Sequence, residues 1–142
     1  MEETGQNRIK NSNTVMICDD DYDFLNLFQK GIGSKYSVIA IDSGTECISR
    51  YIDEKAKGNK IDVLIVNYDL HDLPGGIVAT TIRDLNGDNI GRTKTILLSA
   101  SELDKELIED LKTKNCVTDS ARKPVSIESL MKIIESHCRT KK

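Results

Sequence analysis

The sequence predicts an α/β fold in which one open parallel sheet carries helices on both faces. Short runs rich in β-branched residues alternate with longer segments whose apolar residues recur at helical spacing. Several of the short runs are apolar throughout, as expected of strands buried on both faces. Strands that alternate with helices form parallel sheets with right-handed crossovers. With 142 residues, one such domain with a buried core is expected.

Five strand–helix pairs follow one another along the chain. The expected strands cover residues 14–18, 36–41, 61–66, 95–99 and 117–121. The expected helices run from Tyr22 to the glycines at 31 and 33, between turns at 42–44 and 57–60, from about 77 to 85, over 102–114, and from Ser126 onward. Five such units fit the flavodoxin-like doubly wound sheet, with strand order 2-1-3-4-5.

The N-terminal segment, the hydropathy pattern and the net charge restrict the location and the partners to be expected. Residues 1–13 are polar, and we expect a disordered leader there, followed by a single domain over 14–142. The leader lacks the apolar region of a signal peptide, and no stretch reaches membrane-spanning length, so a cytoplasmic protein is expected. A net charge of −3 gives no electrostatic reason to expect nucleic acid or an anionic membrane as partner.

Polar side chains follow the carboxyl ends of four predicted strands, where ligands bind in open α/β sheets. Two acids, a hydroxyl group and an ammonium group at one edge suit Mg²⁺-assisted phosphoryl transfer. The simpler alternative is an acidic turn that caps the following helix, with the hydroxyl as a second cap and the lysine as a surface charge. The residues are Asp19 and Asp20 after the first strand, Asn67 and Asp69 after the third, Ser99 on the fourth and Lys123 after the fifth.

These segments resemble the response-regulator receiver domain of two-component signalling. The matching residues are Ile17-Cys18-Asp19-Asp20-Asp21, Ile61-Asp62-Val63-Leu64-Ile65-Val66 with Pro74-Gly75-Gly76, Ile96-Leu97-Leu98-Ser99-Ala100, and Arg122-Lys123-Pro124. The resemblance covers nearly the whole chain after residue 13. It implies a domain that accepts a phosphoryl group from a histidine kinase onto an aspartate, with Mg²⁺, and then changes its fourth and fifth βα units to alter partner binding. Asp19 and Asp20 would hold Mg²⁺, Ser99 would contact the phosphoryl group, and Lys123 would pair with it.

Three positions depart from the family pattern. The family's acceptor aspartate ends the third strand, five residues after an aspartate matching Asp62, and here that position is Asn67. An amide is a much poorer nucleophile than a carboxylate and brings no charge to a metal site. Pro74 lies seven residues after Asn67 and five after Asp69, where the family has four, so either the loop carries an insertion or Asp69 is a displaced acceptor. Strand alternation puts 67 and 69 on the same side. The aromatic residue that the family has three positions before the lysine is Ser120.

Three hypotheses follow. In the first, the chain is a stand-alone pseudo-receiver, a non-enzymatic phosphorelay module that binds a histidine kinase or another signalling protein through its fourth and fifth βα units. In the second, it is a working receiver phosphorylated at Asp69. In the third, it is a haloacid-dehalogenase-like phosphatase with Asp19 as nucleophile, since an Asp-x-Asp pattern follows the first strand. Mg²⁺ is the expected cofactor, with binding weakened by Asn67.

Overall fold

The computed structural model describes residues 13–86, 93–100 and 105–138. Their strands form one parallel five-stranded sheet in the order β2-β1-β3-β4-β5, which confirms the predicted fold and strand order. The strands are β1 (Thr14–Cys18), β2 (Ser37–Ile41), β3 (Val63–Asn67), β4 (Lys94–Ser99) and β5 (Asp119–Arg122). The helices are α2 (Tyr22–Ile32), α3 (Gly44–Ala56), α4 (Gly75–Asn86), α5 (Lys105–Thr113) and α6 (Ile127–Cys138).

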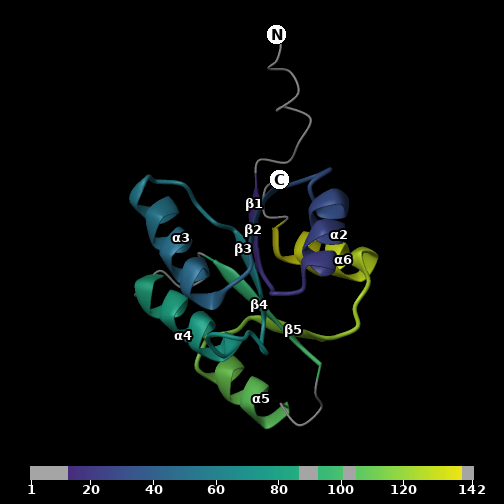
Figure 1. Cartoon of the computed structure of the whole chain (residues 1–142). Helices are drawn as coiled ribbons and strands as arrows, with labels where there is room; N and C mark the ends of the chain where they lie inside the picture. Colours follow the sequence, from purple (N-terminus) through teal and green to yellow (C-terminus); the bar gives the residue numbers. More distant parts are fainter. Residues whose placement is uncertain (1–12, 87–92, 101–104, 139–142) are drawn as a thin grey trace.

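Helices cover both faces of the sheet. Helices α3, α4 and α5 lie on one face and α2 and α6 on the other (Figure 1). Side chains alternate along β1, so that Met16 and Cys18 pack towards α3 and α4, whereas Val15 and Ile17 pack towards α2 and α6. Because the central strands are buried on both faces, they are apolar at nearly every position.

The amino ends of α2, α3 and α6 are capped by the side chains that precede them. Asp21 Oδ1 accepts hydrogen bonds from the backbone N–H groups of Asp23 and Phe24 at the start of α2. Ser43 caps α3 through the N–H of Glu46, and Ser126 accepts from Ser129 N ahead of α6. These caps satisfy N–H groups that have no partner within the helix.

Three predicted boundaries are wrong by two residues. The third strand, predicted from residue 61, begins at Val63, and the other two differ for local reasons. The fifth strand was predicted over 117–121 and spans Asp119–Arg122, because Cys116 and Val117 donate their N–H groups to Leu111 O and so close the end of α5. The fourth helix was predicted from about 77 and begins at Gly75, directly after Pro74. Consecutive glycines resemble a loop in the sequence, yet here they form the first turn of a helix.

Some expectations fall at the edges of the described ranges. Residues 1–12, 87–92 and 101–104 lie outside them, and with them most of the predicted leader, the loop before β4 and the start of the predicted helix over 102–114. Asn13, the last residue of the predicted leader, is buried and accepts a hydrogen bond from Ser37 N. Among the described helices, none is long and apolar enough to cross a membrane.

Candidate functional site

The parallel sheet brings the polar strand ends to one edge. Asp19 follows β1, Asn67 is the last residue of β3, and Ser99 is the last residue of β4. All three are at most 6% exposed, although their side chains are polar. Lys123 follows β5 and donates its backbone N–H to Ser99 O, 2.9 Å away, which fixes the fifth strand end beside the fourth.

Asp19 and Lys123 form a buried ion pair. The Lys123 ammonium nitrogen lies 2.9 Å from Asp19 Oδ2, and the Asp19 side chain is fully buried. The second oxygen of Asp19 accepts the N–H of Asp21 at 3.0 Å. The ammonium also lies 5.0 Å from the centroid of the Phe24 ring, a cation–π contact that sequence analysis missed. A buried carboxylate is costly without a cation, and here the chain supplies one.

Asp20 has a different partner, His71, which sequence analysis also missed. The backbone N–H of His71 donates to Asp20 Oδ2 at 2.9 Å, and the imidazole Nδ1 lies 3.0 Å from the same oxygen. Because an ionised carboxylate only accepts hydrogen bonds, Nδ1 must be the donor. The hydrogen bond to Asp20 raises the pKa of His71 above its usual value. Both acids at the end of β1 are therefore paired with side chains of the same chain.

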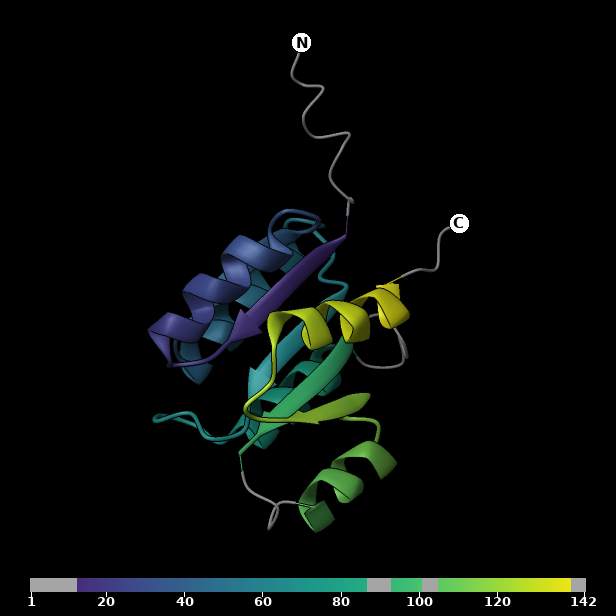
Figure 2. The ribbon, with the colours of Figure 1, turned by 90° about the vertical axis from the view of Figure 1, so that its right-hand side faces the viewer.

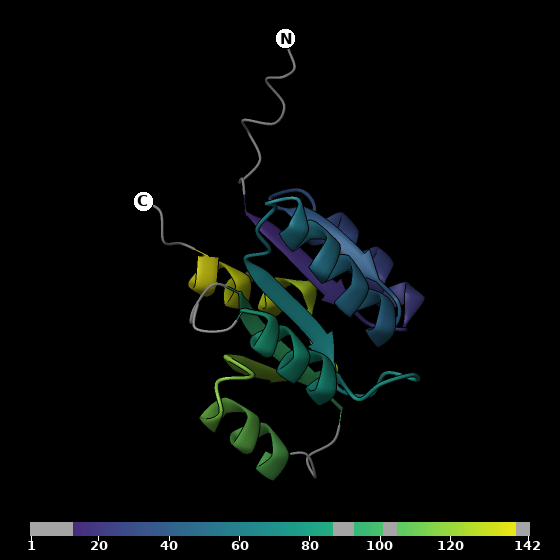
Figure 3. The same ribbon diagram turned by 90° about the vertical axis from the view of Figure 1, so that its left-hand side faces the viewer.

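His71 reaches Asp20 because the segment after β3 forms a narrow hairpin. Gly75 N donates to Tyr68 O at 2.8 Å, and Asp69 and Pro74 form an isolated antiparallel bridge. We call residues 68–74 the β3–α4 loop; it projects beyond the carboxyl end of β3 (Figures 2 and 3). The two ends of the loop approach so closely that a Cβ at Gly75 would collide with the backbone of Asn67 and Tyr68.

The loop is also held on the amino end of α3. Asp72 accepts the N–H groups of Gly44 and Thr45, each at 2.9 Å, and the Thr45 hydroxyl at 2.7 Å. These hydrogen bonds lower the pKa of Asp72 well below its usual value, with Gly44 N–H as the largest cause. A carboxylate at this end of a helix also interacts favourably with the helix dipole. Leu70 packs into the core between α3 and α4, so the loop is anchored on both sides of its tip.

Asn67 keeps its place in the sheet, whereas Asp69 leaves it. Asn67 pairs with Leu98 in the β3–β4 register and is buried. Its Nδ2 donates to the backbone oxygen of Asp69 at 3.2 Å. The Asp69 residue is exposed, and in the described part of the chain its carboxylate makes no hydrogen bond or ion pair. The structure thus brings the backbone of Asp69, and not its carboxylate, to Asn67.

The remaining departure concerns the fifth strand. Ser120 lies opposite Leu97 in the β4–β5 register and is half-buried. Its backbone N–H is held by the side chain of the preceding residue, Asp119. A serine here has no ring to pack against the end of β4, so the site lacks the aromatic coupling that the resemblance implies.

The donor groups at this edge have the chemistry that Mg²⁺ requires, since carboxylate and amide oxygens are its usual protein ligands. Their present contacts compete with it. Asp19 carries Lys123 on one oxygen and a backbone N–H on the other, and Asp20 Oδ2 carries two donors of His71. No group of three or more His, Cys, Asp or Glu side chains suited to a metal occurs among the described residues. With only two acids at this edge, both already engaged by other groups of the chain, the described residues fit a resident Mg²⁺ poorly.

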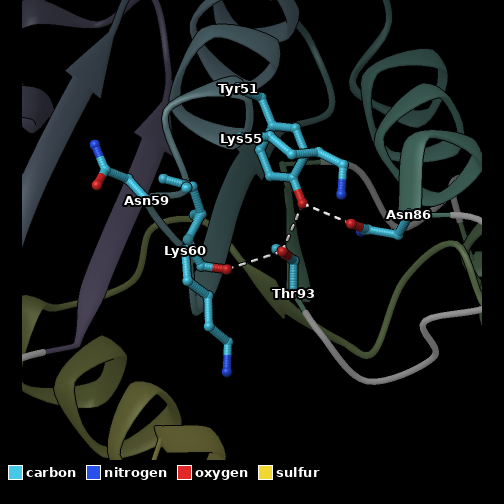
Figure 4. A pocket seen from close by; sticks show the side chains of 8 residues that line it. Tyr51, Lys55, Asn59, Lys60, Asn86 and Thr93 are labelled. Atoms are coloured by element: carbon cyan, nitrogen blue, oxygen red, sulfur yellow. Dashed lines mark hydrogen bonds between the residues drawn. The ribbon is translucent and has the colours of Figure 1, made fainter.

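A separate cavity of about 180 Å³ lies at the amino ends of the strands, opposite the candidate site. Residues at the C-terminal ends of α3 and α4 help to line it (Figure 4). The Tyr51 hydroxyl lies 3.0 Å from Asn86 Oδ1 and 2.8 Å from Thr93 Oγ1, and Thr93 Oγ1 donates to Ile61 O at 2.8 Å. These polar groups satisfy one another. The network therefore has a structural role: it joins α3 and α4 to the start of β4.

Comparison with known proteins gives no match to a family model and no match to a curated protein sequence. Solved structures do match. The receiver domain of the Francisella response regulator 1452 shares 22% identity with a TM-score of 0.71, covering 89% of this chain and 96% of that one. A CheY-like receiver domain protein from Methanospirillum hungatei shares 16% identity with a TM-score of 0.71, at 89% and 93% coverage.

A structure titled adenylate cyclase from Rhodopirellula baltica also matches, with 19% identity, a TM-score of 0.75 and coverage of 89% and 87%. At these identities the similarity is one of fold. The strand order and the helices on both faces of the sheet point to the same fold as these structural neighbours. The chain has the fold of the response-regulator receiver domains.

Proposed function

We propose that this chain is a receiver-like signalling module that acts by binding another protein, and that its output does not depend on phosphorylation at position 67. One observation carries the proposal. An amide, Asn67, ends β3 in register with β4, in the position that the resemblance gives to the acceptor carboxylate. An amide nitrogen bonded to the Asp69 carbonyl offers no nucleophile for a phosphoryl group.

The hairpin shape of the β3–α4 loop supports an insertion rather than a displaced acceptor. An insertion would keep Asn67 at the strand end and move Pro74 further along the sequence. The hydrogen bond between Gly75 N and Tyr68 O closes the extra residues into a separate turn, as an insertion requires. A displaced acceptor would need the Asp69 carboxylate beside Asp19 and Asp20. The backbone oxygen of Asp69, rather than its carboxylate, meets Asn67 at the strand end, which argues against this second candidate.

The phosphatase alternative finds less support. A nucleophilic Asp19 must approach substrate, but its side chain is fully buried and paired with Lys123. Such burial suits a structural or metal-binding carboxylate better than an attacking one. We therefore propose no enzymatic activity for this edge, and we propose that Asp19, Asp20, Ser99 and Lys123 form a polar centre held together by contacts within the chain.

The partner is proposed to be a histidine kinase or another signalling protein that docks on the fourth and fifth βα units. Helix α5 offers a suitable surface, because Leu107 is 39% exposed among mainly charged neighbours. Ile77 at the start of α4 is also exposed. Both residues lie on helices that flank β4, on the same face of the sheet.

The proposal is tested by intact-mass spectrometry after incubation with Mg²⁺ and a small-molecule acyl phosphate. Wild type, Asn67→Asp and Asp69→Ala are treated together. We expect no phosphoryl adduct on wild type or Asp69→Ala and a gain on Asn67→Asp, since a carboxylate restores the nucleophile. An adduct on wild type that disappears in Asp69→Ala would overturn the proposal and identify a working receiver with a displaced acceptor.

A further inference from the structure

We propose that two copies of this chain pair through the outer edge of β2, as antiparallel strands centred on Ile39, so that their two sheets become one. Such pairing requires neither phosphorylation nor the docking surface on the fourth and fifth βα units. Three features of β2 support it: the direction of its backbone groups, the absence of edge protection and the charges next to its two ends.

The backbone of β2 has one side turned away from the sheet. Ser37 N donates to Asn13 O at 3.2 Å, and Ile41 O accepts from Asp19 N at 3.1 Å, so both residues bond towards β1. Successive residues of a strand direct their N–H and C=O groups to opposite sides. Val38 and Ala40 therefore point theirs outward, and among the described residues no strand lies beyond β2.

The β2 edge lacks the features that usually keep a sheet edge from pairing with another chain. Edge strands are commonly protected by charged residues, proline or a bulge. β2 has the sequence Ser-Val-Ile-Ala-Ile and pairs with β1 in unbroken register. The other edge strand, β5, carries Asp119 and Arg122 among its four residues. An uncharged, regular edge such as β2 suits the addition of a strand.

The flanking helices leave this edge partly open. Val38 and Ala40 pack towards α2 and α6, and Ile39 packs towards α3 and α4. All three side chains are only half-buried, whereas residues 15–18 of the neighbouring β1 are fully buried. Apolar surface is therefore exposed along β2, and an added strand would remove it from water.

A second copy of β2 matches this edge residue by residue. In the register centred on Ile39, Val38 lies opposite the partner's Ala40, and Ala40 lies opposite the partner's Val38. These are the outward-facing residues, so each pair can exchange both of its N–H···O bonds. Ile39 faces the partner's Ile39 on the same side of the joined sheet, and β-branched side chains of this kind form favourable cross-strand pairs.

The charges next to β2 favour the antiparallel orientation. Lys35 lies just before the strand and Asp42 directly after it. Antiparallel pairing brings the basic end of each copy to the acidic end of the other, whereas parallel pairing would bring like charges together. Lys35 contacts Glu135 at 3.3 Å and Asp42 accepts the Tyr22 hydroxyl at 2.7 Å, but both contacts are exposed and therefore weak. Since the two-fold arrangement uses the β2 edge of both copies, assembly stops at a dimer.

The test compares wild type with two substitutions of Val38 in the full chain. Val38→Pro removes an outward N–H and leaves the bonds to β1 intact, and proline is tolerated where an edge N–H faces solvent. Val38→Thr is the matched control, because it keeps the N–H and the β-branched shape. In sedimentation equilibrium from micromolar to millimolar chain concentration, we expect wild type and Val38→Thr to approach the mass of a dimer. Val38→Pro should stay monomeric.

Amide hydrogen exchange of wild type, followed by ¹⁵N-HSQC NMR in a dilute and a concentrated sample, locates the interface without any substitution. We expect exchange at Val38 and Ala40 to slow by at least about fivefold in the concentrated sample. Ile39, whose N–H faces β1, should be protected in both samples. This measurement decides the proposal by itself if Val38→Pro does not fold.

Three results would overturn the proposal. Wild type that stays monomeric at millimolar concentration excludes pairing of two copies. A dimer in which Val38 and Ala40 exchange equally fast in both samples forms through another surface. Protection of these two amides in a monomer means that a segment of the same chain covers the edge.

Discussion

Replacing Lys123 with Met should destabilise the fold, because it leaves the Asp19 carboxylate buried without its cation. Methionine keeps an apolar stem of similar length beside the Phe24 ring. Removing one partner of a buried ion pair costs about 3–5 kcal/mol. Asp19 is fully buried, but Lys123 is 20% exposed and the N–H of Asp21 remains on Asp19. We therefore expect the lower end of that range, about 3 kcal/mol.

Urea unfolding without divalent cations measures this loss. With a slope of about 2 kcal/mol per molar urea, the midpoint should fall by about 1.5 M. The double variant Asp19→Asn/Lys123→Met removes the buried charge as well, and it should regain at least about 1 kcal/mol over Lys123→Met alone. A loss below about 1 kcal/mol, the value of an exposed pair, would refute the reasoning, as would a double variant no more stable than the single one.

Three further predictions concern the loop and the opposite edge of the sheet. Tyr51→Phe removes the hydroxyl that joins α3 to α4 and β4, and should cost about 1 kcal/mol in urea unfolding; no loss would contradict the role given to the network. Gly75→Ala puts a Cβ onto the Asn67 backbone and should cost about 2–3 kcal/mol. Gly76→Ala should be close to neutral, because its Cβ would meet only side-chain atoms, of Leu111 at 3.3 Å and of Tyr68 at 3.7 Å. Equal effects of the two substitutions would contradict the close approach at Gly75. The lowered pKa of Asp72 means that its stabilising charge is fully present above about pH 4 and is lost as pH falls below that value. The difference in melting temperature between wild type and Asp72→Asn should accordingly be largest near neutral pH and shrink in acid, and a constant difference would contradict this assignment.

The central strands of the sheet could be predicted from the sequence because they are apolar on both faces. The runs ending at Cys18 and Asn67 have almost no polar residue, so their burial and their parallel pairing follow from pattern alone. The fifth strand, Asp119–Arg122, is polar and lies at the edge of the sheet, where pattern is weak. Its start was therefore misplaced, since the two residues that close α5 are as apolar as a strand.

The strand-end residues of the candidate site were predictable, but their partners were not. Asp19 and Lys123 follow strands whose ends must meet in this topology. The contact between His71 and Asp20 joins residues 51 positions apart and depends on the path of the loop. The distance of Pro74 from Asn67 in the sequence indicated an altered loop. The position of the loop tip, however, depends on the Asp69–Pro74 pairing and on the close backbone approach at Gly75, which the sequence does not show.

The central claim is that this receiver fold signals without a phosphoryl group, and NMR spectroscopy with beryllofluoride, a phosphoryl mimic, tests it most directly. The ¹⁵N-HSQC spectrum of wild type in Mg²⁺ is recorded before and after the addition, with Asn67→Asp as positive control. We predict unchanged amide signals throughout α4, α5 and β5 of wild type, and shifts in the variant. Shifts in those elements of wild type would contradict the account, because they would mean that the site responds to the mimic without a carboxylate at position 67.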